Sequence, residues 1–300
     1  GKAWDLDRKR DGLFILPPAQ TYKNNRIYKG DIDNLHANLD YLHRSSQEYV
    51  VIASSNVICN INYNEAFEYH INSDADITAI YKQVSTPEQS KNQTVIETDK
   101  ENNIIEMKVS PARQIYNKIC LEKFIMKKEL LIDIIDDCYS TGNWDFIKDG
   151  IIKNIDKYKI KAFPFKGYMA NINSLSSYFN NSLELLKPEI KKDIFFKNQI
   201  FTKPKDEAPT KFSDKGQAKN IIAANGCIIE GDVENSILFR GVTIKRGAHV
   251  KNSIIMQKST VGRNAKLENV IIDKNAKIKN NGEFKGSKNF PIVIEKNAIV

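Results

Sequence analysis

The sequence predicts an α/β domain followed by a three-sided parallel β-helix. Three related six-residue segments begin at residues 234, 251 and 268, a constant period of 17 residues. Between them apolar residues recur every five or six positions, so each coil provides three short strands. Upstream, apolar runs alternate with amphipathic helical patterns, which is typical of an α/β domain. The alternative for the repeats, an antiparallel meander, requires the spacing to be accidental.

The 17-residue repeat predicts which side chains stack on one another. Asn235, Asn252 and Asn269 share one column at a corner, where asparagine tolerates a left-handed backbone or forms a side-chain ladder. A polar loop over 280–289 interrupts the coils, and the pattern resumes over 291–300. The predicted apolar columns are Leu238/Ile255/Ile272, Val233/Val250/Leu267 and Ile244/Val261/Ile278.

Periodicity and capping residues predict the elements of the α/β domain. Leu35, Leu39 and Leu42 lie on one face of a helix expected over 33–44, and Asn62 is expected to cap a helix ending at His70. The apolar run 49–53 predicts a buried parallel strand. Strands separated by helices predict a largely parallel sheet. The other expected elements are strand 77–81, a hairpin of 94–98 and 104–107, helix 127–138, strand 159–163 and helix 174–186.

We expect residues 1–186 to form the α/β domain and 221–300 the β-helix. The intervening segment 187–220 is rich in Lys, Pro and Asp and is expected to be a linker. The chain begins without methionine and stops within a coil pattern, so we expect a fragment.

Composition narrows the function classes. The 300 residues carry a net charge of +8, but the charges are dispersed and no nucleic-acid-binding motif is found, so no nucleic acid is expected. No apolar run approaches the length of a transmembrane helix, and no membrane association is expected. Four widely spaced cysteines predict reduced, mostly buried thiols in a cytoplasmic protein; they are Cys59, Cys120, Cys138 and Cys227.

Seven short sequence segments resemble, in order and spacing, segments of a known enzyme family. They are WDLDR (4–8), ILPPAQ (15–20), YKGDIDN (28–34), YVVIA (49–53), FPF (163–165), YMANIN (168–173) and VENSILFRG (233–241). In order and spacing they resemble bacterial glucose-1-phosphate adenylyltransferase, the ADP-glucose pyrophosphorylase family. The resemblance implies a Rossmann-like nucleotidyltransferase domain, of which this chain is expected to lack the first βα unit, and a left-handed β-helix of hexapeptide-type repeats. It also implies the family's reaction, in which ATP and glucose 1-phosphate give ADP-glucose and pyrophosphate.

The sequence departs from the family at the expected metal site. The family anchors Mg²⁺ with two aspartates, and Asn56 and Asn171 stand at those positions here. A carboxamide brings no negative charge, so both anchors are lost and Mg²⁺ should bind weakly or not at all. We therefore expect no intact catalytic residue, no tightly bound metal, and little activity from this chain alone.

The sequence also departs from the family's pattern on the sugar-phosphate side of the expected site. Lys108 is displaced from the family's Glu-Lys-Pro pattern, and residues 120–124 (CLEKF) replace a stretch of smaller residues that contains glycine. Bulky and charged residues there should crowd a sugar. Tyr28, Gly30 and Asp33 match the family, so part of the cleft is expected to survive with weak binding of ATP or a sugar phosphate.

Together these features resemble the family's non-catalytic, GlgD-type subunit of glycogen biosynthesis. The resemblance implies a regulatory role, a catalytic homologue as partner, and a tetramer. The segment with Pro17, Pro18, Gln20 and Lys23 matches a loop that couples effector binding to the family's active site; a solvent loop stiffened by two prolines remains the other interpretation. The alternative function is an active glucose-1-phosphate adenylyltransferase with an atypical metal site.

Overall fold

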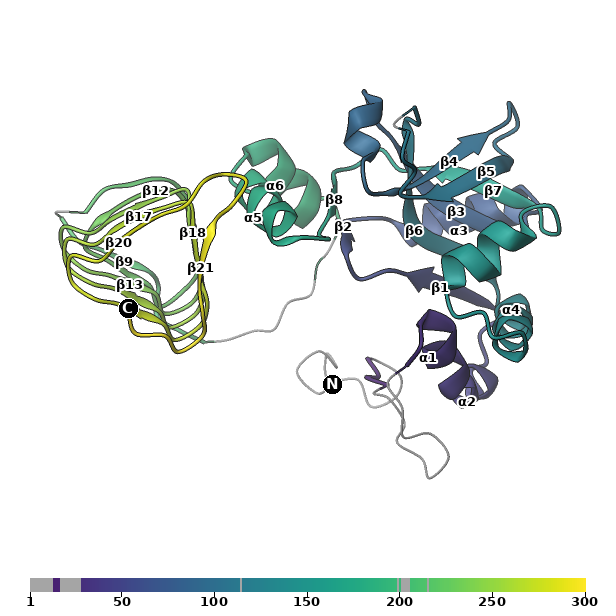
Figure 1. The fold of residues 1–300 in the computed structure, drawn as a ribbon, viewed down its shortest axis with the longest axis horizontal. Coiled ribbons are helices and arrows are strands. Elements are labelled where there is room, and N and C mark those ends of the chain that lie inside the picture. The colour runs from purple at the N-terminus through teal and green to yellow at the C-terminus, as the bar shows by residue number, and fades with distance from the viewer. Residues whose placement is uncertain (1–12, 17–27, 114, 199, 201–205, 215) are drawn as a thin grey trace. The chain divides into compact units, whose positions relative to one another are not determined.

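The chain divides into two compact units, Gly1–Met169 and Ala170–Val300. The computed structural model describes residues 13–16, 28–113, 115–198, 200, 206–214 and 216–300 (Figure 1). The first unit is an α/β domain and the second contains the β-helix, as the sequence predicts.

The α/β unit combines four described α-helices with a mixed sheet. The helices are α1 (Asp31–Ala37), α2 (Leu39–Arg44), α3 (Tyr63–Asn72) and α4 (Lys128–Ser140), with shorter helical turns at Pro87–Ser90, Phe146–Ile151 and Ile152–Asn154. The strands are β1 (Tyr49–Ala53), β2 (Val57–Cys59), β3 (Ile77–Gln83), β4 (Thr94–Thr98), β5 (Ile104–Val109), β6 (Lys118–Lys127), β7 (Ile160–Pro164) and β8 (Met169–Asn171), which contains the unit boundary.

The expectation of a largely parallel sheet is wrong for the strands described. The six-stranded sheet has the order β5-β4-β6-β3-β7, with β1 also paired to β6, and only β3 and β7 run parallel in it. Strand β6 was not anticipated, because Glu122 and Lys123 interrupt its apolar pattern. β1 is antiparallel to β6 and exposes Val51 and Ala53, so the predicted buried parallel strand is also wrong. β2 and β8 form a separate two-stranded sheet.

Local capping accounts for the helix boundaries. Asn62 caps α3 as predicted, its side-chain oxygen accepting a hydrogen bond from the backbone N–H of Asn64 at 3.1 Å. The single helix expected over 33–44 is instead two, α1 and α2, which meet at Asn38. The Asn38 amide donates to the backbone oxygen of Asn34 at 2.8 Å, a local bond that competes with continued helix formation.

The second unit winds short strands into coils, seen stacked in Figure 1. Its helices are α5 (Leu175–Glu184) and α6 (Pro188–Phe195). Its strands are β9 (Lys211–Phe212), β10 (Ala218–Ala223), β11 (Ile228–Ile229), β12 (Asp232–Leu238), β13 (Thr243–Ile244), β14 (His249–Lys251), β15 (Ile254–Ile255), β16 (Thr260–Val261), β17 (Lys266–Glu268), β18 (Val270–Ile272), β19 (Lys277–Ile278), β20 (Glu283–Lys285) and β21 (Ile292–Ile294).

The predicted apolar columns are confirmed by the strand register. Leu238 pairs with Ile255 and Ile255 with Ile272, all in parallel strands and all at most 1% exposed. The columns through Val250 and Val261 are in register in the same way. Each coil therefore buries its apolar side chains against those of the next, and the stack forms one continuous core.

The asparagine corner is also confirmed. Asn235, Asn252 and Asn269 have φ values of 47°, 46° and 53°. The next residues, Ser236 and Ser253, are fully buried and form a ladder: each hydroxyl donates to a backbone oxygen of its own coil and accepts a backbone N–H from the next. Asparagine accepts the left-handed turn, and serine satisfies the backbone groups that the turn buries.

The unit boundary lies before the domain boundary expected at residue 186. Helix α5 belongs to the β-helix unit because Phe179 is fully buried in a cluster with Ile254 and Ile271. The segment 187–220, expected to be a linker, contains α6, β9 and β10, and β10 pairs in parallel with β12. Amphipathic periodicity located α5 correctly, but it does not identify the surface that a helix covers.

Candidate functional site

The end of β1 carries the first expected metal position. Asn56 lies half-buried between β1 and β2. The backbone N–H of Ser54 donates to the backbone oxygen of Glu122 at 3.2 Å, which ties this turn to the centre of β6. The Ser54 hydroxyl is buried and has no hydrogen-bond partner in the described part of the chain.

Glu122 forms a bulge in β6 beside this turn. The pairing of β6 with β3 shifts register between Phe124 and Cys120, and Glu122 between them has a φ of 53°. Its carboxylate accepts a hydrogen bond from the Thr94 hydroxyl at 2.8 Å. A left-handed backbone favours glycine, the residue that the resemblance expects within this stretch. In this chain the bulge has glutamate at the left-handed position, and the side chain makes that backbone conformation strained.

The residues at the two expected metal positions do not fit Mg²⁺. Asn171 is half-buried at the end of β8, and like Asn56 it offers a neutral carboxamide. Among the described residues, no three His, Cys, Asp or Glu side chains come together as metal ligands. Mg²⁺ requires anionic oxygen to offset the cost of removing its water, which neither asparagine supplies.

Tyr28, Gly30 and Asp33 lie together at the start of α1. Asp33 is 8% exposed, and its carboxylate accepts the backbone N–H of Lys29 at 3.0 Å. Gly30 lies against the backbone of Trp144, so any side chain there would collide with the Trp144 carbonyl group. That carbonyl also accepts the N–H of Ile32 at 3.1 Å. These contacts give Gly30 and Asp33 a local structural role whether or not they also touch a ligand.

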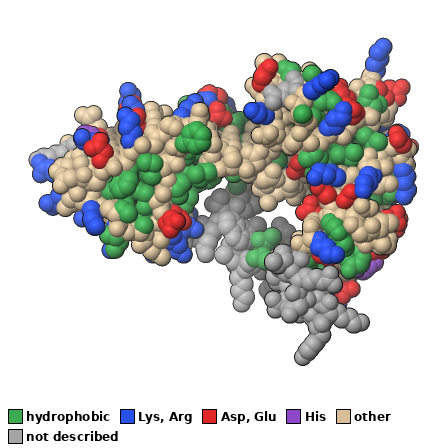
Figure 2. Space-filling model, in the orientation of Figure 1, with side chains coloured by type: hydrophobic (Ala, Val, Ile, Leu, Met, Phe, Trp, Pro, Cys, Tyr) green, Lys and Arg blue, Asp and Glu red, His purple; other side chains and the backbone are tan. Residues whose placement is uncertain are grey.

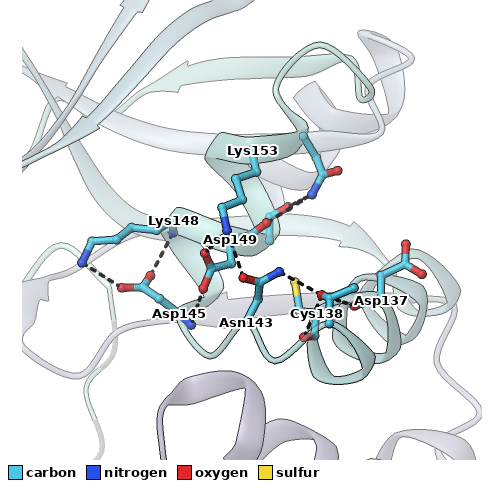
Figure 3. A network of polar contacts seen from close by, with 10 residues as sticks. Asp137, Cys138, Asn143, Asp145, Lys148, Asp149 and Lys153 are labelled. Atoms are coloured by element: carbon cyan, nitrogen blue, oxygen red, sulfur yellow. Dashed lines mark hydrogen bonds and ion pairs between the residues drawn. The ribbon is translucent and has the colours of Figure 1, made fainter.

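The Trp144 segment is held by a polar network (Figure 3). Lys153 pairs with Asp149 at 2.8 Å and donates to the Asn143 side chain at 2.9 Å. The hydrogen bond from Lys153 lowers the pKa of Asp149, so the Asp149 carboxylate stays charged at neutral pH. Asp145 pairs with Lys148 at 3.3 Å. The network fixes the loop against which α1 begins.

Lys108 is engaged on β5. Its ammonium contacts the Glu106 carboxylate at 2.6 Å and the Tyr116 hydroxyl at 2.8 Å, and that hydroxyl donates to Glu106 at 2.8 Å. The hydrogen bond with Glu106 raises the pKa of Lys108, and the same bond lowers the pKa of Glu106. Both side chains are nearly half exposed, and a phosphate at Lys108 would have to compete with Glu106 for the ammonium.

The remaining predicted site residues lie outside the described part of the chain. Pro17, Pro18, Gln20 and Lys23 all fall within residues 17–27, which the structure does not describe. The proposed coupling loop therefore stays a prediction from the sequence.

The outer face of the β-helix carries an ordered ladder of charge. Successive coils place Lys219, Glu234, Lys251, Glu268 and Lys285 in register. Neighbours pair at 3.5 Å (Lys251 with Glu234) and 2.9 Å (Lys285 with Glu268). On the face drawn in Figure 2, positive and negative side chains are interspersed in the coloured part of the molecule. Exposed pairs of this kind contribute little stability, but they form a patterned surface.

Lys123 was missed in the sequence as a candidate site residue. It is 4% exposed within β6, and its ammonium donates to the backbone oxygen of Val57 at 3.4 Å. A charged residue between Leu121 and Ile125, which both occupy core positions, was the available signal. Without the strand assignment for β6, that signal could not be recognised.

Two family models match the chain. A nucleotidyl transferase model matches residues 13–229, and a GlmU-like C-terminal hexapeptide model matches residues 208–284. With the folds described above, these matches define a nucleotidyltransferase α/β domain followed by a hexapeptide β-helix.

Individual relatives make the family assignment more specific. The chain is 34% identical over its whole length to the glycogen biosynthesis protein GlgD of Bacillus subtilis and spans 77% of that protein. It is 35% identical over 82% of its length to the glucose-1-phosphate adenylyltransferase of Thermosipho melanesiensis, of which it spans 60%. The chain belongs to the ADP-glucose pyrophosphorylase family of glycogen biosynthesis. At these identities the GlgD-type and adenylyltransferase-type members are not separated.

Every helix that the structure describes is too short or too polar to span a bilayer. The four cysteines are free thiols, three buried and one half-buried, as the sequence predicts.

Proposed function

We propose that the chain is a regulatory, catalytically deficient subunit of ADP-glucose pyrophosphorylase that acts in the cytoplasm. In this role it assembles with a catalytic homologue, in a tetramer of the kind the resemblance implies, and changes that subunit's rate or effector response. It binds no metal tightly and binds ATP or a sugar phosphate weakly.

The chemistry of the metal positions supports this proposal most strongly. Asn56 and Asn171 replace two carboxylates, and losing both should lower transition-state stabilisation by several kcal/mol. One such change could be compensated by a neighbouring acid. Two changes at paired positions remove both negative charges from the metal side, and Glu106 competes with a phosphate for Lys108.

The match to GlgD over the whole chain supports the regulatory role. The name of that relative mentions glycogen biosynthesis but no enzymatic activity. The β-helix offers the surface for assembly. Its outward charge ladder through Glu234, Lys251 and Glu268 presents a fixed pattern that a partner with complementary charges would recognise.

The second candidate is an active glucose-1-phosphate adenylyltransferase with an atypical metal site. The relatives from Thermosipho melanesiensis and Thermosipho africanus favour it, because they carry that enzyme's name and are 35% and 36% identical to this chain. The two candidate functions predict different catalytic activities for the protein without a partner subunit.

The deciding assay is ADP-glucose formation by the full-length protein with ATP, glucose 1-phosphate and Mg²⁺. The regulatory role predicts a rate at least about a thousandfold below that of a catalytic homologue, equivalent to about 4 kcal/mol. A rate within about tenfold of the homologue would establish the active enzyme instead. The matched control is the homologue with both metal aspartates changed to asparagine, which should fall to a similarly low rate.

A further inference from the structure

A buried lysine at the end of β1 is not used by the proposed function. Lys123 is 4% exposed and pairs in register with Ala53, the last residue of β1. Leu121 and Ile125, two residues away on either side, belong to an apolar cluster that also contains Val57. The ammonium group is therefore held within the protein, at the point where the chain leaves β1 for the first expected metal position.

The Lys123 ammonium has little to neutralise it. It has three N–H donors, and its one hydrogen bond to the described residues goes to the backbone oxygen of Val57 at 3.4 Å. A buried cation is ordinarily paired with an anion. The nearest carboxylate in sequence, that of Glu122, instead accepts a hydrogen bond from Thr94. Because Val57 follows Asn56 directly, the Lys123 ammonium contacts the backbone one residue after the position where a metal carboxylate is expected.

Cys59 and Ser54 lie on the same segment of the chain as Asn56. Burial raises the pKa of the Cys59 thiol, and the nearby Lys123 opposes that rise. The Ser54 hydroxyl is buried without a partner among the described residues. Of these groups the ammonium is the one that repels a divalent cation, and neither the Asn56 carboxamide nor the Ser54 hydroxyl brings a negative charge to offset it.

We propose that the Lys123 ammonium is a built-in cation that takes the place of a divalent metal ion at the end of β1 and excludes Mg²⁺ from Asn56. The inference rests on the proposed function and deepens it, because it identifies a residue that keeps the site free of metal. Its consequence is specific: restoring a carboxylate at position 56 does not restore metal binding while Lys123 remains. The ammonium captures the new carboxylate as an internal ion pair.

The test is a double-mutant cycle in the full-length protein with Asn56→Asp, Lys123→Met and the two combined. Methionine keeps the length and the apolar stem of lysine, so the fold should be preserved. Mn²⁺, which is visible by electron paramagnetic resonance, is the probe. We expect Mn²⁺ to bind the double variant at least about tenfold more tightly than the Asn56→Asp variant. With Lys123 present, we also expect Asn56→Asp to raise the thermal unfolding midpoint by about 2–4 °C. With methionine at position 123, the same substitution should leave the midpoint unchanged or decrease it.

The matched control is Lys161→Met combined with Asn56→Asp. Lys161 is also buried, at 8% exposure, but its ammonium donates to the backbone oxygen of Glu101, in the β4–β5 turn, at 3.0 Å. This control should bind Mn²⁺ no better than Asn56→Asp alone. The proposal is overturned if the two backgrounds show no coupling in the unfolding midpoint. It is equally overturned if Asn56→Asp alone binds Mn²⁺ as tightly as the double variant, or if the double variant gains no affinity. The proposed function is tested by activity and by assembly with a catalytic homologue, neither of which is measured with these variants. Its failure can therefore be distinguished from failure of the inference about Lys123.

Discussion

Glu122 provides a direct test of the bulge beside the candidate site. Its φ of 53° costs a residue with a side chain about 1–2 kcal/mol relative to a right-handed conformation. Glu122→Gly and Glu122→Ala both remove the hydrogen bond to Thr94, so that loss cancels between them. Only glycine relieves the backbone strain. In an ordinary strand alanine is more stable than glycine by roughly 0.5–1 kcal/mol. At position 122 we expect the order to invert, with glycine more stable by about 1 kcal/mol.

The two variants are compared by thermal unfolding followed with circular dichroism. A difference of 1 kcal/mol corresponds to about 2–4 °C in the midpoint for a unit of this size. The control is the same pair at Ile105, an exposed position in β5 with an ordinary backbone, where alanine should be the more stable. If alanine equals or exceeds glycine at position 122, Glu122 is not strained and the description of the bulge is wrong.

Two further predictions concern the cores of the two units. Phe179→Ala should destabilise the β-helix unit by about 3–5 kcal/mol in chemical denaturation, because the ring is fully buried against Ile254 and Ile271; Phe179→Leu should cost clearly less, and equal costs would contradict the packing. Burial raises the pKa of Cys120 to about 12, above its unfolded value, so the stability it contributes is present below about pH 9 and is lost as pH rises towards 12. Cys120→Ala should therefore lose stability less steeply than the wild type between about pH 9 and 11 in unfolding scans; parallel curves would contradict this assignment.

The β-helix could be predicted in detail because its determinants are local. Each coil repeats the same inward positions, so the columns through Leu238, Val250 and Val261 follow from spacing alone. The corner asparagines were found for the same reason, since Asn252 sits at the same place in its coil as its neighbours do in theirs. The stacking of these columns depends on contacts that the repeat itself specifies.

The α/β unit was predicted less well, because its errors involve long-range pairing. The run 49–53 has the apolar composition of a buried parallel strand, but an edge strand antiparallel to β6 has the same composition. β6 itself was hidden because Glu122 sits on a bulge and Lys123 is a buried charge, two exceptions to alternation in one strand. Such exceptions gather at functional sites, which is why the sequence was least informative where the candidate site lies.

The measurement that most directly tests the regulatory role is assembly. The full-length protein is mixed with a catalytic homologue, and light scattering after size-exclusion chromatography is recorded together with ADP-glucose formation over a range of effector concentrations. Allosteric action requires that this chain contact two states of its partner differently, so binding must change rate or effector affinity. We predict a hetero-oligomer whose rate or effector response differs from that of the catalytic homologue alone. Two proteins that elute separately, with the catalytic rate and effector response unaltered, would contradict the account.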